Sequence, residues 1–189
     1  TINFNPALDY VVETKELKIG EINRSQKEHI LAGVKGINVS IVLKTLGIQS
    51  TALGFVAGFV GDEIERNVKK YGINTDFIKL ENGNSWINVK IATIAEETAI
   101  NGKGPNVEET DIQALYQKLE KIENGDILVL SGSIPEGISQ DCYQNICKKV
   151  KEKDIKMIVD ATGELLTKTL PYQPFLIKPN QEELGEIFN

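Results

Sequence analysis

The sequence has only one histidine, two cysteines and one tryptophan among its 189 residues. A single histidine excludes a metal site built from several histidines, and any Ser-His-Asp chemistry would depend on His29 alone. The residues around His29 are typical of an exposed strand, so we expect it to have no catalytic role. Cys142 and Cys147 lie five positions apart in one expected helix, which favours reduced thiols over a disulfide.

An excess of basic residues and long apolar runs are also missing. The 21 basic and 27 acidic residues give a net charge of −6, which argues against an extended nucleic-acid-binding surface. No apolar run reaches membrane-spanning length, and the first residues lack the basic-then-apolar pattern of a secretory signal. We therefore expect a cytoplasmic protein that binds a small molecule and neither nucleic acid nor a membrane.

What the sequence does contain is a regular alternation of strand and helix patterns in its second half. Residues 126–130 and 156–159 are continuous apolar strands, and residues 108–122 and 140–153 have helical patterns. Strands that are apolar on both faces are typical of a parallel sheet covered by helices. The sequence thus predicts an α/β fold with a parallel-rich sheet.

Two segments have a different pattern. Within residues 74–104, a turn at Asn82-Gly83 precedes a strand, residues 85–94, in which apolar and polar side chains alternate. Residues 10–31 are also rich in β-forming side chains. We expect the two segments to form a small sheet apart from the core, inserted into one domain that spans residues 1–189. A lid over a binding site is the obvious use of such a sheet.

A glycine-containing loop leads into an apolar helix over residues 32–47. Gly33 permits close approach of a ligand to the backbone, and residues 37–46 are apolar on nearly every face, which predicts a helix packed inside the domain. The free N–H groups at a helix start attract anions, and Lys35 and Asn38 stand beside them as donors. A tight, closely packed turn would explain the glycines equally well.

Polar side chains follow the expected strands of the core at their carboxyl ends, where open α/β sheets bind ligands. They are Asn5 and Asp9, Ser131 and Ser133, Asp160, and Lys178 with Asn180. Local explanations exist, because Asn180 and Glu183 fit a helix-capping box and Asp160 could cap a turn. If these residues form a binding site, Asp9 would accept hydrogen bonds from the hydroxyl groups of a sugar, and Lys35 and Lys90 would bind a phosphate.

The same set of residues would suit phosphoryl transfer, which needs mainly positioning and charge neutralisation. In that interpretation Lys178 faces nucleotide phosphates, and Asn180 with Glu183 holds Mg²⁺ through water. Seven segments together resemble, in this order, the 1-phosphofructokinase branch of the ribokinase-like (PfkB) sugar kinases. They are Asn5-Pro-Ala-Leu-Asp9, Ala32-Gly-Val-Lys-Gly-Ile-Asn38, Ile87-Asn-Val-Lys90, Asn101-Gly-Lys-Gly-Pro105, Leu130-Ser-Gly-Ser133, Asp160-Ala-Thr-Gly163 and Lys178-Pro-Asn-Gln-Glu-Glu183.

The resemblance implies ATP-dependent phosphorylation of fructose 1-phosphate at its C6 hydroxyl, with Mg²⁺. It also implies a three-layer α/β/α core with a β lid that often makes a dimer contact. By motif match the substrate-binding residues would be Asp9, Gly33, Lys35, Asn38, Asn88, Lys90 and Ser133, and the residues for ATP and the metal would be Lys178, Asn180 and Glu183. A tagatose-6-phosphate or fructose-6-phosphate kinase of the same family, and a non-catalytic sugar-phosphate-binding module, remain as alternatives.

Three departures from the family pattern affect these expectations. Val34 stands where the family usually has a second glycine, and Trp86 stands where an arginine is expected beside the phosphate. The Gly-Ala-Gly-Asp segment that supplies the family's catalytic base is absent, and its place lies beyond residue 189. Gly58 to Asp62 is no substitute, because it matches a separate glycine motif. The sequence thus resembles the N-terminal portion of a kinase, and we expect this chain alone to be inactive.

Overall fold

The computed structural model describes residues 1–32, 35–135 and 137–188. Its main sheet has the strand order β11-β10-β9-β1-β4-β5, and β6 also pairs with β4. Every pair in this sheet is parallel. The strands are β1 (Ile2–Asn3), β4 (Thr51–Ala57), β5 (Asn74–Thr75), β6 (Ile78–Leu80), β9 (Ile127–Ser131), β10 (Lys156–Asp160) and β11 (Leu176–Ile177).

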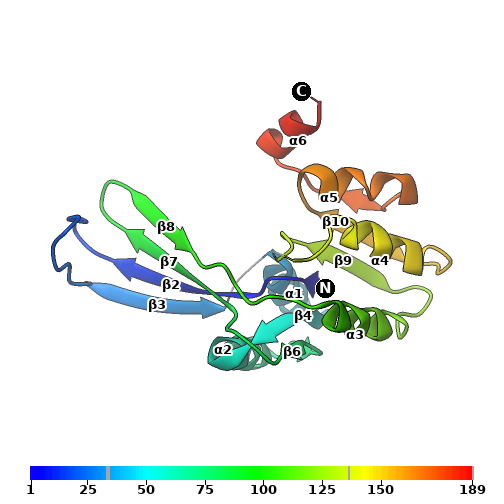
Figure 1. Cartoon of the computed structure of the whole chain (residues 1–189), viewed down its shortest axis with the longest axis horizontal. Coiled ribbons are helices and arrows are strands. Elements are labelled where there is room, and N and C mark those ends of the chain that lie inside the picture. Colours follow the sequence, from blue (N-terminus) through cyan, green and yellow to red (C-terminus); the bar gives the residue numbers. More distant parts are fainter. Residues whose placement is uncertain (33–34, 136, 189) are drawn as a thin grey trace.

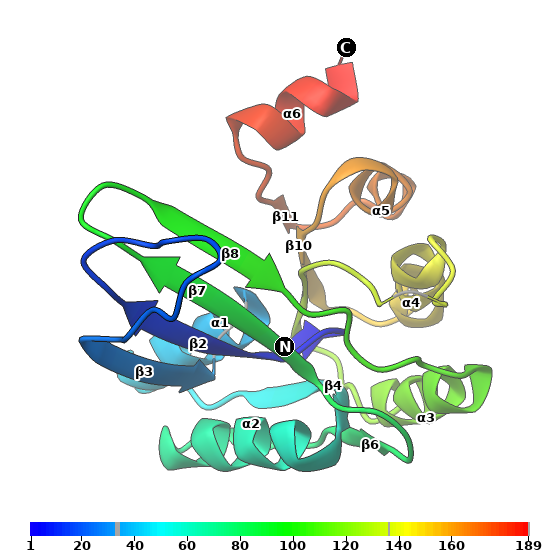
Figure 2. The same cartoon turned by 60° about the vertical axis from the view of Figure 1, so that its left-hand side comes forward.

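Helices cover both faces of this sheet, so the predicted three-layer α/β/α arrangement is confirmed (Figure 2). One face packs under α3 (Glu109–Leu119), α4 (Cys142–Val150) and α5 (Gly163–Thr167). Its core includes Phe4, Phe55 and Tyr143, whose rings lie in contact around Phe4. The other face packs under α1 (Lys35–Thr45) and α2 (Gly58–Lys70). A short 3-10 helix (Leu170–Tyr172) precedes β11, and α6 (Gln181–Phe188) follows it.

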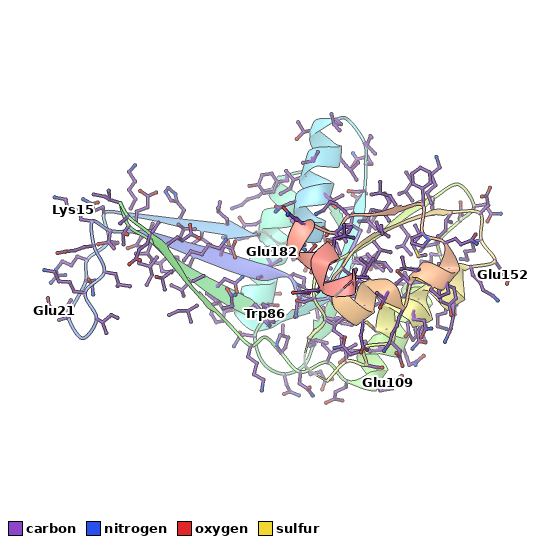
Figure 3. All side chains as sticks on the ribbon, turned by 90° about the horizontal axis from the view of Figure 1, so that it is seen from above. Lys15, Glu21, Trp86, Glu109, Glu152 and Glu182 are labelled. Atoms are coloured by element: carbon purple, nitrogen blue, oxygen red, sulfur yellow. The ribbon has the colours of Figure 1, made fainter. Side chains whose placement is uncertain are left out.

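A second sheet of four strands extends away from this core (Figure 1). Its order is β3-β2-β7-β8, with β2 (Ala7–Glu13), β3 (Lys27–Ala32), β7 (Trp86–Ala92) and β8 (Glu97–Asn101). The loop that carries Lys15 and Glu21 lies at its far tip, and Trp86 lies at its base (Figure 3). This sheet thus joins chain segments that lie far apart in the sequence.

The structure corrects two expectations. Residues 74–80 do not join the second sheet. They form β5 and β6 beside β4, because Ile78 and Leu80 point into the core, where each is 8% exposed. Helix α1 is not enclosed on all sides, because Val42 is 58% exposed and Leu46, just after the helix, is 70% exposed. An apolar pattern on every face permits burial of a helix on all sides but does not require it. One side of α1 is exposed to solvent.

Candidate functional site

The first group of polar side chains lies on one face of the second sheet. Asp9 in β2 stands directly opposite Asn88 in β7. The Asn88 amide donates a hydrogen bond to Asp9 Oδ1 at 3.0 Å, and Lys90 Nζ donates to Asp9 Oδ2 at 2.9 Å. The hydrogen bond to Asp9 raises the pKa of Lys90 above its ordinary value. These contacts fix the orientation of the Asp9 carboxylate. Its remaining lone pairs can accept hydrogen bonds from hydroxyl groups.

A second group lies at the carboxyl end of β10. The carboxylate of Asp160 is almost completely buried, and its Oδ1 lies 3.3 Å from Lys178 Nζ and 3.5 Å from Lys35 Nζ. Lys35 Nζ lies 3.5 Å from Glu183 Oε1 as well. The Ser131 hydroxyl approaches the other oxygen of Asp160 at 3.5 Å. Two ammonium groups and two carboxylates thus alternate in space, and their charges cancel.

This second group joins residues that the sequence assigned to different ligands. Lys35, at the start of α1, was expected at the sugar, whereas Lys178 and Glu183 were expected at the nucleotide. The sequence assigned Asp160 no role in binding, and it is the residue that contacts both lysines. Its position as the last residue of an apolar strand placed it among the candidate site residues, but its contacts with the lysines could not be read from that position.

The start of α6 contains the capping box that the sequence suggested for Asn180 and Glu183. The Glu183 backbone N–H donates to Asn180 Oδ1 at 2.8 Å, and the Asn180 backbone N–H donates to Glu183 Oε2 at 2.9 Å. The second bond, and less strongly the charge of Lys35, lower the pKa of Glu183. Glu183 Oε1 faces Lys35, so this oxygen already attracts a cation.

The oxygen atoms available as metal ligands determine how a magnesium ion could bind at this site. Among the described residues no group of three or more His, Cys, Asp or Glu side chains could hold a metal ion. The capping box also occupies Asn180 Oδ1 and Glu183 Oε2. Ordered water can still bridge such oxygens to Mg²⁺, which usually keeps several of its waters. The residues therefore fit an ion held through water and not one held directly.

The other expected site residues are placed less tightly. Asn38 is exposed on α1, and Ser133 is exposed in the loop after β9. Gly33 and Val34 lie outside the described residues. The structure thus brings Asp9, Asn88 and Lys90 together, and separately Lys35, Lys178 and Glu183.

Two buried asparagines near the end of β1 also belong to this region. Asn3 is 3% exposed and Asn5 is 5% exposed, and in the described part of the chain their amide Nδ2 atoms have no hydrogen-bond partner. Asn3 lies against Gly36 of α1, where an added Cβ would be 3.2 Å from the Asn3 Cβ. Asn5 belongs to the Asn5-Pro-Ala-Leu-Asp9 segment that the sequence singled out, whereas Asn3, a polar residue at the end of a central strand, was missed.

Comparison with known proteins identifies the kind of protein that carries this arrangement. Residues 5–189 match the family model described as pfkB family carbohydrate kinase. The chain belongs to this family. Over its whole length it is 40% identical to a 1-phosphofructokinase of Bacillus subtilis and 40% identical to a D-tagatose-1-phosphate kinase of Bacillus licheniformis. It covers 61% of the first protein and 62% of the second.

The solved structures agree with the fold of this kinase family. Phosphofructokinase-2 from Escherichia coli, in complex with fructose-6-phosphate, superposes with a TM-score of 0.91 at 26% identity. All of this chain and 63% of that chain are covered. The pfkB chain therefore has the ribokinase-like α/β fold and spans about three fifths of the length of these relatives. None of its described helices is long and apolar enough to cross a membrane.

Proposed function

We propose that this pfkB chain is part of a kinase that transfers a phosphoryl group from ATP to the C6 hydroxyl of fructose 1-phosphate, giving fructose 1,6-bisphosphate. The observation that carries the proposal is the Asp9 carboxylate, held by Asn88 and Lys90 on the face of the second sheet. A fixed carboxylate with free lone pairs is suited to sugar hydroxyl groups. The matching 1-phosphofructokinase of Bacillus subtilis supports the choice of sugar.

The second group of charges would serve the nucleotide. The ammonium groups of Lys178 and Lys35 would pair with phosphate oxygens. Asp160 holds both groups at the carboxyl end of β10. Mg²⁺ would be held through water by Asn180 and Glu183, and when bound it would neutralise charge on the ATP phosphates. Phosphoryl transfer depends mainly on such positioning and neutralisation, so these residues would contribute by holding the phosphates in place.

The general base is expected in a Gly-Ala-Gly-Asp segment, which this sequence does not contain. A positioned base contributes about 10²–10⁴-fold to a rate. We therefore expect negligible turnover from this chain by itself, even where it binds the sugar phosphate. A rate close to that of its relatives, measured on the chain after its mass has been verified, would contradict this.

D-tagatose 1-phosphate is the second candidate substrate, because a kinase named for it is as similar to this chain as the 1-phosphofructokinase is. The test is the full product of the gene that contains this sequence, assayed for ADP release. Its substrates are fructose 1-phosphate, D-tagatose 1-phosphate, tagatose 6-phosphate and fructose 6-phosphate. We expect the highest kcat/KM for fructose 1-phosphate. A higher kcat/KM for another sugar phosphate would identify that compound as the substrate instead. Binding without any turnover would favour a non-catalytic sugar-phosphate-binding module.

We also propose that two copies of the chain associate through the second sheet. Ile30, Tyr10, Val89 and Ile100 stand opposite one another across its four strands, on the face away from Asp9. Ile30 is 59% exposed and Ile100 is 61% exposed. Tyr10 and Val89 between them are half-buried. A row with exposed apolar side chains at both ends, on a sheet that extends from the core, favours burial against a partner, and a second copy offers the same row.

A further inference from the structure

Three buried polar side chains form a row across the middle of the main sheet. Asn3 in β1 stands opposite Ser131 in β9, and Ser131 stands opposite Asp160 in β10. They are 3%, 0% and 6% exposed. Residues paired across neighbouring strands point to the same face of a sheet. Polar side chains in the centre of a buried sheet cost free energy unless they have partners, so packing alone does not explain the row.

The two ends of this row meet the same turn of α1. At one end, a Cβ added to Gly36 would lie 3.2 Å from the Asn3 Cβ and 3.6 Å from Asn3 Nδ2. At the other end, Lys35 Nζ lies 3.5 Å from Asp160 Oδ1. Lys35 and Gly36 are the first two residues of α1. The backbone of this first turn therefore rests on Asn3, and the charged side chain of the turn extends to Asp160.

The Asn3 side chain is held in one orientation. Its Oδ1 accepts the Asn5 backbone N–H at 3.1 Å. Because this bond assigns Oδ1 to the Asn5 side, Nδ2 is the amide atom that faces the first turn of α1. In the described part of the chain Nδ2 has no hydrogen-bond partner. A buried donor without a partner costs stability, which favours a role for Asn3 other than stabilising the sheet.

The height of this turn above β1 determines how far Lys35 reaches. Its ammonium lies 3.5 Å from both Asp160 Oδ1 and Glu183 Oε1, which is longer than a typical N–H···O hydrogen bond. Neither carboxylate therefore locks Lys35 in place, and the backbone of the turn sets where the ammonium stands. Displacement of a positioning group by about 1 Å can reduce a reaction rate about 100-fold.

From these contacts we propose that Asn3 is a positioning residue for Lys35. Its side chain supports the first turn of α1 at the height from which Lys35 Nζ reaches a phosphate oxygen of ATP. Asn3 itself touches no ligand, because it is buried beneath the helix. This inference rests on the proposed function, because it takes Lys35 to bind a phosphate group of ATP.

The test uses the full product of the gene that contains this sequence, assayed for ADP release with ATP and fructose 1-phosphate. We expect Asn3→Ala to raise the KM for ATP about tenfold, the effect of weakening one charged hydrogen bond, and to leave the KM for fructose 1-phosphate unchanged. Gly36→Ala should have the same effect, because its Cβ would push the turn away from Asn3, although alanine is the better helix former.

Asn124→Ala is the matched control for the loss of an asparagine side chain. Asn124 Oδ1 also accepts a backbone N–H, that of Asp154 at 3.0 Å, and the residue lies just before the start of β9 and not at its carboxyl end. This variant should leave both KM values unchanged.

A double-mutant cycle shows whether Asn3 acts through Lys35. In a Lys35→Ala background, which removes the ammonium, we expect Asn3→Ala to cause no further rise in the KM for ATP. A purely structural role of Asn3 predicts losses that add in the double variant, and additive losses would overturn the inference.

The outcomes separate this inference from the proposed function. An unchanged KM for ATP in Asn3→Ala, or in Gly36→Ala where Asn3→Ala does not fold, would overturn the role of Asn3 and leave the proposed function standing. An equal rise in the KM for fructose 1-phosphate would show a general disturbance of the site and would also overturn that role. No turnover of any sugar phosphate by the folded wild-type product would overturn the proposed function itself, and the inference with it.

Discussion

Lys90 Nζ lies 2.9 Å from Asp9 Oδ2, and this contact joins two strands of the second sheet whose residues are 81 positions apart in sequence. Asp9 is also held by Asn88, so both of its oxygens have a protein partner. A carboxylate fixed in this way has a defined direction for further hydrogen bonds. The ion pair therefore acts on binding through the position of Asp9, and it contributes to the stability of the sheet.

The first prediction concerns this ion pair and pH. The folded-state pKa of Lys90 is raised by Asp9, so its contribution to stability is complete below the unfolded pKa of about 10.5 and is lost as the pH rises through the folded value. Urea unfolding should therefore show wild type as more stable than Lys90→Met at about pH 8, with the difference shrinking above about pH 10.5. A difference that grows with pH in this range would contradict the assignment.

The second prediction concerns the two cysteines, which are free, as the sequence suggested, and which are also buried. Burial raises the pKa of Cys142 to about 12 and that of Cys147 to about 11. Because the thiolate is the reactive form, neither thiol should react with Ellman's reagent in the folded protein at about pH 8, and both should react after unfolding in urea. Rapid reaction of one thiol without urea would show that α4 opens locally or packs differently.

The third prediction concerns the close approach of β1 and β4. A Cβ at Gly54 would lie 1.8 Å from the backbone oxygen of Asn3, and the φ of Gly54 is +150°. Gly54→Ala should therefore cost more than about 4 kcal/mol of unfolding free energy or prevent folding, because both partners are backbone of the central sheet. Gly125→Ala has a positive φ but nothing within 4 Å, and it should cost only about 1–3 kcal/mol. Equal effects of the two in thermal unfolding would rule out the close approach.

The fourth prediction concerns association through the second sheet. Ile100→Lys places a charge in the apolar row and should convert a dimer to a monomer in sedimentation velocity, because a buried unpaired charge is costly. Ile127→Lys is the matched control, since Ile127 is 60% exposed and lies in β9 of the core. A monomeric wild-type chain, or dimers in both variants, would exclude the proposed contact.

Much of this arrangement could be predicted from the sequence, for reasons that particular residues illustrate. The apolar runs at β9 and β10 predicted a parallel sheet, and side chains of both strands are buried in the core with those of α3, α4 and α5. The capping box of Asn180 and Glu183 was predictable because it depends on residues three apart. The motifs quoted above identified the family because they fall in one order along the whole chain.

Other features depend on contacts between distant segments, which local patterns do not encode. The two ion pairs of Asp160 join the ends of β10, β11 and α1, so only the folded chain shows that Asp160 holds both lysines. Residues 74–80 have the same alternation as a strand of the second sheet, and only their pairing with β4 assigns them to the core. The close approach of Gly104 to the Trp86 indole, where an added Cβ would lie 1.5 Å from Nε1, is likewise visible only in the folded chain.

The measurement that tests the central proposal most directly is calorimetric titration of this chain with fructose 1-phosphate. We predict saturable binding that falls about 10- to 100-fold in Asp9→Ala, because that variant removes a charged acceptor of sugar hydroxyl groups. Asp62→Ala is the control, since Asp62 forms a similar ion pair with Lys79 away from the site and should leave the affinity unchanged. No binding by the folded chain, or equal affinity in wild type and Asp9→Ala, would contradict the proposed sugar-phosphate site.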